Sequence, residues 1–144
     1  LVIDLAGLFQ PGAPKDAIRF TPGKGKSRSA WSKAMSSLDA QVEAPPILRI
    51  QNPDMGTPPV SWKFWQDLFL LLPEGRTVVC CMGGHGRTGT VLACLMLVGW
   101  PALGAKEVVA YVQEHHCKNA IESQKQEEYI VLMETLRDQG GNNV

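Results

Sequence analysis

The residues best suited to chemistry lie together in the segment CMGGHGRTG, which covers positions 81–89. Cys81 follows the apolar run TVVC, and five residues, three of them glycine, separate it from Arg87. Because glycine lacks a Cβ atom, backbone N–H groups can turn inward there and form a nest that binds an anion. Arginine holds two phosphate oxygens with its planar guanidinium, and positive surroundings favour the nucleophilic thiolate form of cysteine. The segment therefore predicts a loop that binds phosphate and activates a thiol.

Two other chemistries use a glycine-rich loop between a strand and a helix. The Walker nucleotide loop shares the spacing of Gly84 and Gly89, but Thr90 stands where that loop needs a lysine. The dinucleotide-binding fingerprint matches Gly84, Gly86 and Gly89, but it also needs an acidic residue at the end of the next strand. The nearest candidate, Glu107, lies in a helical pattern. The thiol and phosphate interpretation uses every unusual residue of the loop, and we favour it.

Strands and helices alternate along the chain and position this loop. We expect strands at residues 1–7, 45–51 and 77–80, and helices at residues 29–42, 59–72, 88–98, 104–116 and 122–138. The segments 9–29 and 52–59 have the proline and glycine content of loops, with a short extended piece at 17–20. This alternation predicts an α/β fold with a largely parallel sheet. The length of 144 residues, without internal repeats, predicts a single domain.

The bulk composition excludes several classes of protein. Equal numbers of basic and acidic residues, 14 each, give no overall electrostatic preference for nucleic acid or membranes. The four cysteines, with Cys80 and Cys81 adjacent, do not resemble a secreted disulfide framework, so we expect a reducing, cytoplasmic setting. The acidic Asp4 argues against a signal peptide at the start of the sequence. The uncharged stretch 88–105 is interrupted by glycine and proline, which favours a buried helix over a membrane span.

The segment CMGGHGRTG resembles the signature of the cysteine-based protein tyrosine phosphatase superfamily, which is C-x5-R followed by serine or threonine. Two further segments agree in the right order. PDMGTP at 53–58 resembles the acid loop of that family, and AIESQKQEEYI at 120–130 resembles the segment that presents a glutamine to the site. The short chain resembles the compact, dual-specificity-like members. The resemblance implies one catalytic domain over residues 1–144, with a mostly parallel sheet of about four to five strands flanked by helices.

The resemblance also implies a role for each site residue. Cys81 would be the nucleophile and form a phosphocysteine, Thr88 would hydrogen-bond its sulfur, and Asp54 would be the general acid. Gln126 would orient the water that attacks in the second step. The phosphate would be bound by the loop residues Met82, Gly83, Gly84, His85, Gly86 and Arg87. No metal or other cofactor is implied. Phosphorylated proteins or other phosphomonoesters would be substrates, and phosphate or vanadate would be ligands.

Three residues depart from the family pattern and keep other functions open. Cys80 stands where the family usually has histidine, Asn52 stands where a tryptophan often begins the acid loop, and Glu122 replaces a glutamine of some members. Cys80 and Glu122 leave open a catalytically weak module that only binds phosphate. His85 and the basic segment 24–28 would suit a polyanionic substrate such as a phosphoinositide or an RNA 5′ phosphate.

Each assignment also has a plain structural alternative. Cys81 could be a buried apolar cysteine in a tight turn, and Asp54 could simply form a turn. Glu122 and Gln126 could lie on a solvated helix face. The HHC segment at 115–117 has no second pair of ligands with zinc-like spacing, so we interpret it as a helix end.

Overall fold

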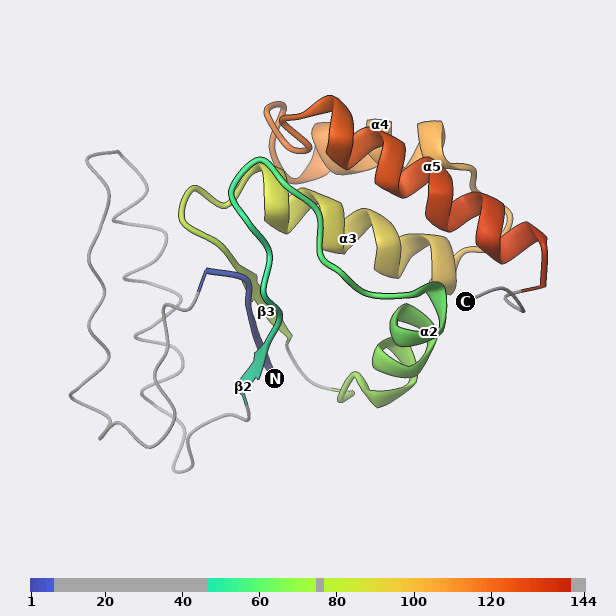
Figure 1. Cartoon of the computed structure of the whole chain (residues 1–144), viewed down its shortest axis with the longest axis horizontal. Coiled ribbons are helices and arrows are strands. Elements are labelled where there is room, and N and C mark those ends of the chain that lie inside the picture. The colour runs from blue at the N-terminus through green and yellow to red at the C-terminus, as the bar shows by residue number, and fades with distance from the viewer. Residues whose placement is uncertain (7–46, 75–76, 141–144) are drawn as a thin grey trace.

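The protein is described by a computed structural model that covers residues 1–6, 47–74 and 77–140 (Figure 1). The helix predicted at 29–42, the extended piece at 17–20 and the basic segment 24–28 lie outside the described residues. The described part combines helices with a parallel sheet, so the predicted α/β class is confirmed.

The sheet of the described residues has three strands in the order β2-β1-β3. They are β1 (Val2–Asp4), β2 (Ile47–Arg49) and β3 (Val78–Cys80). Ile3 on the central strand pairs with Leu48 on one side and Val79 on the other, and both pairings are parallel. Every residue of β1 is buried, the acidic Asp4 as well as the apolar Val2 and Ile3. The larger number of four to five strands is not confirmed, and the single-domain assignment stays a prediction.

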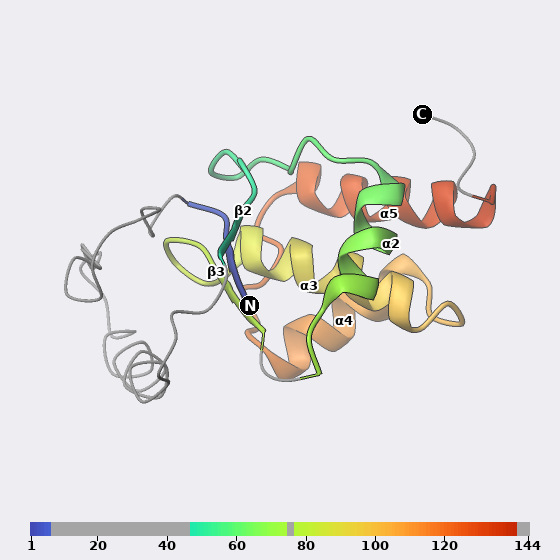
Figure 2. The same cartoon turned by 90° about the horizontal axis from the view of Figure 1, so that it is seen from below.

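Four helices follow the order predicted from the sequence. They are α2 (Trp62–Leu71), α3 (Gly86–Gly99), α4 (Ala105–His115) and α5 (Gln124–Asp138). In both views the four described helices lie on the same side of the sheet (Figures 1 and 2). α3 packs against each of the other three helices and against β3. This central position explains why α3 is apolar on all sides, with Val91 and Leu97 fully buried.

Three helices start away from the predicted positions, and a serine cap explains two of these starts. α2 begins at Trp62 rather than at residue 59, because Ser61 caps it by accepting a hydrogen bond from the backbone N–H of Phe64. α5 begins at Gln124 rather than at 122, since Ser123 is its cap. α3 begins two residues earlier than predicted, at Gly86, and so includes Arg87 in its first turn. Within the described ranges, no helix is long and apolar enough to cross a membrane.

Candidate active site

The predicted nucleophile lies between the end of β3 and the first turn of α3. Cys81 directly follows β3 and is buried, with 4% of its surface exposed. The Thr88 hydroxyl donates a hydrogen bond to the Cys81 sulfur over 3.1 Å. Thr88 can make this bond because it lies in the first turn of α3, directly after the loop. The positive end of a helix also favours a nearby anion. The sulfur therefore has one hydroxyl donor and the N-terminus of α3 beside it.

The loop that follows Cys81 offers unused backbone donors. In the part of the chain that the structure describes, the N–H groups of Met82, Gly83, Gly84 and His85 have no hydrogen-bond acceptor. Gly84 has a φ of 75°, in the left-handed region that glycine enters without a Cβ penalty. Consecutive free donors of this kind are available to an anion, as the predicted phosphate-binding role requires.

Arg87 joins this loop to the predicted acid loop. Its side chain is buried, and its Nη1 donates to the backbone oxygen of Asn52 over 3.1 Å. Its Nη2 lies 3.3 Å from Oδ1 of Asp54, whose side chain is 82% exposed. A pair this exposed contributes only about 0–1 kcal/mol to stability. Its value is positional, because it brings together the two residues that the sequence predicts for phosphate binding and for proton transfer.

The acid loop is held against α5 by three hydrogen bonds to its backbone carbonyls. Ser123 Oγ donates to Met55 over 2.8 Å, Gln126 Nε2 donates to Gly56 over 3.2 Å, and the Tyr129 hydroxyl donates to Val60 over 2.9 Å. These bonds bridge residues about seventy positions apart in the sequence. They fix the loop that carries Asp54, and nothing in the sequence motifs indicated Ser123 or Tyr129 as part of the site.

Gln126 is fully buried, so its assignment to a solvated helix face is wrong. Its Oε1 accepts hydrogen bonds from the backbone N–H groups of Glu122, over 2.8 Å, and of Ser123, over 3.3 Å. With the bond from Nε2 to Gly56, the donor and acceptor ends of the amide are both engaged. The spacing of Ser123 and Gln126 matches a capping box, and that signal could have revealed this structural role.

Glu122 reaches the phosphate loop instead of pointing away from it. Its Oε2 accepts a hydrogen bond from the backbone N–H of Gly86 over 3.0 Å. A Cβ atom on Gly86 would lie 2.5 Å from that oxygen, so glycine is needed for this close approach. A carboxylate therefore already contacts one amide of the loop expected to bind phosphate.

Cys80 replaces the histidine expected before the nucleophile with an unreactive thiol. It is buried and donates to the backbone oxygen of Ile3 over 3.4 Å. Burial, followed by the negative charges of Asp4 and Cys81, raises the pKa of Cys80 from 9.0 to about 12. Cys80 therefore stays neutral at physiological pH and does not compete with Cys81 as a nucleophile.

The HHC segment contacts the phosphate loop. His116 Nε2 lies 2.6 Å from the backbone oxygen of Gly84, and Cys117 Sγ lies 3.1 Å from Nδ1 of His85. The sequence suggested only a helix end here, and α4 does end at His115. Among the described residues, no three His, Cys, Asp or Glu side chains are grouped closely enough to hold a metal ion. The segment instead supports the loop from outside.

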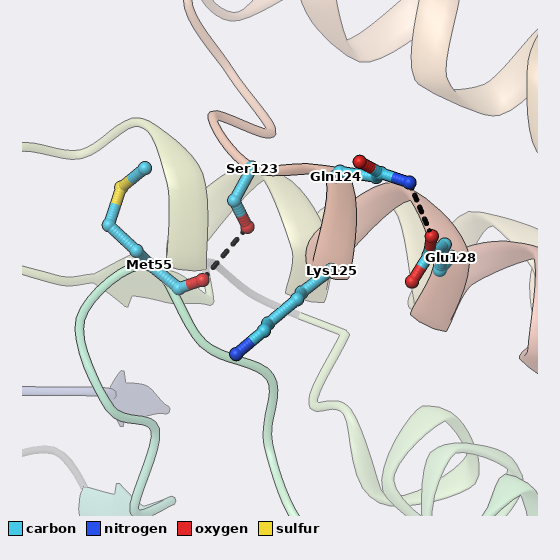
Figure 3. A pocket seen from close by; sticks show the side chains of 5 residues that line it. All are labelled: Met55, Ser123, Gln124, Lys125 and Glu128. Carbon is cyan, nitrogen blue, oxygen red and sulfur yellow. Dashed lines mark hydrogen bonds between the residues drawn. The ribbon is translucent and has the colours of Figure 1, made fainter.

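A surface depression lies where the acid loop meets the start of α5. Its volume is about 480 Å³, and Met55, Ser123, Gln124, Lys125 and Glu128 line it. Figure 3 shows the Ser123 hydroxyl directed to the Met55 carbonyl, with the Lys125 side chain extended beside the acid loop. Met55 follows Asp54 directly in the sequence, whereas Cys81, Arg87 and Asp54 are not among the residues that line the depression.

The same arrangement of strands and helices occurs in a solved structure. The crystal structure of Tk-PTP in the active form superposes with a TM-score of 0.60, covering 93% of this chain and 77% of that one at 19% sequence identity. The chain has a protein tyrosine phosphatase-like fold. At this low identity the likeness concerns the fold alone. The expected fold is thereby confirmed, and the roles of the site residues remain predictions.

Sequence comparison adds relatives that match part of the chain. An uncharacterized protein of Methanocaldococcus jannaschii is 36% identical over 104 residues, which are 66% of this chain and 59% of that protein. A second one from that organism is 38% identical over 95 residues, 60% of this chain and 58% of its own length. Cyclin-dependent kinase inhibitor 3 of Rattus norvegicus is 31% identical over 81 residues, 54% of this chain and 38% of that protein. The chain thus spans less than two thirds of the relatives that it matches. No protein-family model matches the chain.

Proposed function

We propose that the protein is a cysteine-dependent phosphomonoester hydrolase of the protein tyrosine phosphatase type. The observation that carries the proposal is the meeting of Arg87 and Asp54 beside the loop in which Thr88 bonds the Cys81 sulfur. The nucleophile and the arginine come from one strand–loop–helix unit, and the acid comes from a separate loop before it in the chain. A merely structural cysteine in a tight turn would need none of these partners.

In the first step, the Cys81 thiolate attacks phosphorus in line with the leaving oxygen. Arg87 and the free amides of residues 82–85 hold the equatorial phosphate oxygens. The S–P bond forms as the P–O bond to the alcohol breaks, and protonated Asp54 gives its proton to that oxygen. In the ligand-free protein Asp54 contacts the Arg87 guanidinium. When that guanidinium binds the phosphate instead, Asp54 is free to protonate the leaving oxygen.

In the second step, water attacks the phosphocysteine. Asp54, now a carboxylate, takes the proton of that water as the O–P bond forms and the S–P bond breaks. The Thr88 hydroxyl stabilises the departing thiolate. For Gln126 we propose a positioning role, since it ties the acid loop to Glu122. The water-orienting role expected from the resemblance would depend on the second Nε2–H of Gln126, and in the ligand-free protein this amide is fully buried.

The nature of the substrate follows from the surroundings of Asp54. The group that carries the phosphate would lie over the acid loop, where the depression at Met55 and Lys125 gives it room. A phosphorylated protein is the substrate class that we favour, with non-protein phosphomonoesters and pure phosphate binding as alternatives. A reducing cytoplasmic setting belongs to the proposal, because a thiol nucleophile has to stay reduced.

The test is hydrolysis of p-nitrophenyl phosphate in the presence of EDTA by the wild type, Cys81→Ser and Cys80→Ser. We expect activity that survives EDTA, falls to background in Cys81→Ser and persists in Cys80→Ser, the matched change at the neighbouring neutral thiol. Asp54→Asn should lower kcat by about 10²–10⁴-fold. A wild type without activity between about pH 5 and 7 that still binds vanadate would refute the hydrolase and favour the binding module.

A further inference from the structure

The departure at Glu122 has a direct structural consequence for the phosphate loop. Of the amides at residues 82–86, that of Gly86 is the one with a protein acceptor among the described residues, and the acceptor is the Glu122 carboxylate. Gly86 immediately precedes Arg87, inside the loop that the proposed function assigns to phosphate. An anion that enters this loop therefore meets a negative charge already bonded to it.

The backbone before Glu122 is arranged to make this contact. Ile121 has a φ of 62°, a conformation that a β-branched residue adopts only when its surroundings force it. Its side chain is buried, and the backbone of Gly89 in α3 packs closely against it. Beyond it, the Glu122 N–H is held by the buried amide of Gln126 over 2.8 Å. The left-handed backbone at Ile121 and the hydrogen bond from the Glu122 N–H to Gln126 together direct the exposed Glu122 carboxylate to Gly86.

We propose that Glu122 is a specificity-determining residue, which makes the site select substrates with a single phosphate group over polyanions. The inference rests on the proposed function. The carboxylate holds the Gly86 amide and repels each further negative charge brought to the loop. At about 4 Å, repulsion between two unit charges lowers affinity at least about fivefold even when water screens it fully. A monophosphate brings at most about two negative charges to the loop, whereas a pyrophosphate, a multiply phosphorylated lipid headgroup or an RNA end brings further charges, and Glu122 repels each of them.

The substitution Glu122→Gln isolates this charge. The amide oxygen of glutamine can still accept the Gly86 N–H, so the contact is kept and the repulsion is removed. Glu127→Gln is the matched control, because Glu127 is an exposed residue in the first turn of α5 and its carboxylate has no hydrogen bond or ion pair among the described residues. Both variants change the net charge equally.

The experiment measures binding of orthophosphate and pyrophosphate by calorimetry in the Cys81→Ser background, where catalysis plays no part. We expect Glu122→Gln to tighten orthophosphate at least about fivefold and pyrophosphate by at least about fivefold more, with Glu127→Gln changing both anions alike. Equal behaviour of the two variants, or weaker binding in Glu122→Gln, would overturn the inference and leave the phosphate site intact. Binding of neither anion in any variant would instead refute the phosphate site and the proposed function with it.

Discussion

Replacing Gln126 by leucine is expected to destabilise the fold by about 1.5–4.5 kcal/mol. The side chain is fully buried, so leucine, of similar size, fills its space without a large cavity. What is lost is hydrogen bonding, since the amide accepts from the N–H groups of Glu122 and Ser123 and donates to the oxygen of Gly56. Each such bond contributes a net of about 0.5–1.5 kcal/mol, and three of them give the stated range.

The assay is urea unfolding, with Gln124→Leu as the control. Gln124 lies on the same helix, but it is exposed and bonds only Glu128 on the surface, so its replacement should change stability by less than about 0.5 kcal/mol. Gln126→Leu should also lower kcat/KM, because the acid loop loses its bond at Gly56. A loss of stability below about 1 kcal/mol, or equal to that of Gln124→Leu, would show that the buried amide does not hold the acid loop.

Two further predictions concern the cysteines. Thr88→Ala removes the hydroxyl that bonds the Cys81 sulfur. Hydrogen bonds to charged groups contribute about 1.5–3 kcal/mol, so iodoacetamide at pH 7 should alkylate Cys81 at least about tenfold more slowly in Thr88→Ala than in the wild type. Thr135→Ala is the control, and an unchanged alkylation rate in Thr88→Ala contradicts the prediction. Because the folded state raises the pKa of Cys80 from 9.0 to about 12, the unfolded thiol ionises first and stability falls as pH rises above 9. In urea unfolding at several alkaline pH values, the free energy of unfolding of Cys80→Ala should decrease with pH less steeply than that of the wild type, by up to about 1.4 kcal/mol per pH unit. Equal slopes for the two proteins would refute this prediction.

The phosphate loop could be predicted from the sequence because its geometry is local. Cys81 and Arg87 lie within one strand–loop–helix unit, and the glycines between them restrict what the backbone can do. The Thr88 contact with the sulfur follows from the same short segment, since one turn of helix brings it back over the loop. The α/β class was equally accessible, because it depends only on alternating patterns of apolar residues.

The acid loop was predicted by resemblance, and its contact with Arg87 depends on the sheet. β2 and β3 both pair with β1 in parallel, so the carboxyl ends of the strands lie at the same edge of the sheet. The loops that carry Asp54 and Arg87 both begin at that edge, which allows the two side chains to meet. The sequence contains the three strands but not their order. Strand order is decided by pairing between segments far apart in the chain, and no local pattern encodes it.

The sequence by itself determined which groups are available for chemistry: a thiol before a glycine loop, an arginine after it, and an acid in a separate loop. The tertiary structure alone decided what Gln126 and Glu122 do. Gln126 is buried because α5 packs against α3 and the acid loop, and Glu122 reaches Gly86 because Ile121 adopts a left-handed conformation that its own type disfavours. The physical reason is that residue type and short spacing set local geometry, whereas burial and unusual backbone angles result from contacts between distant segments.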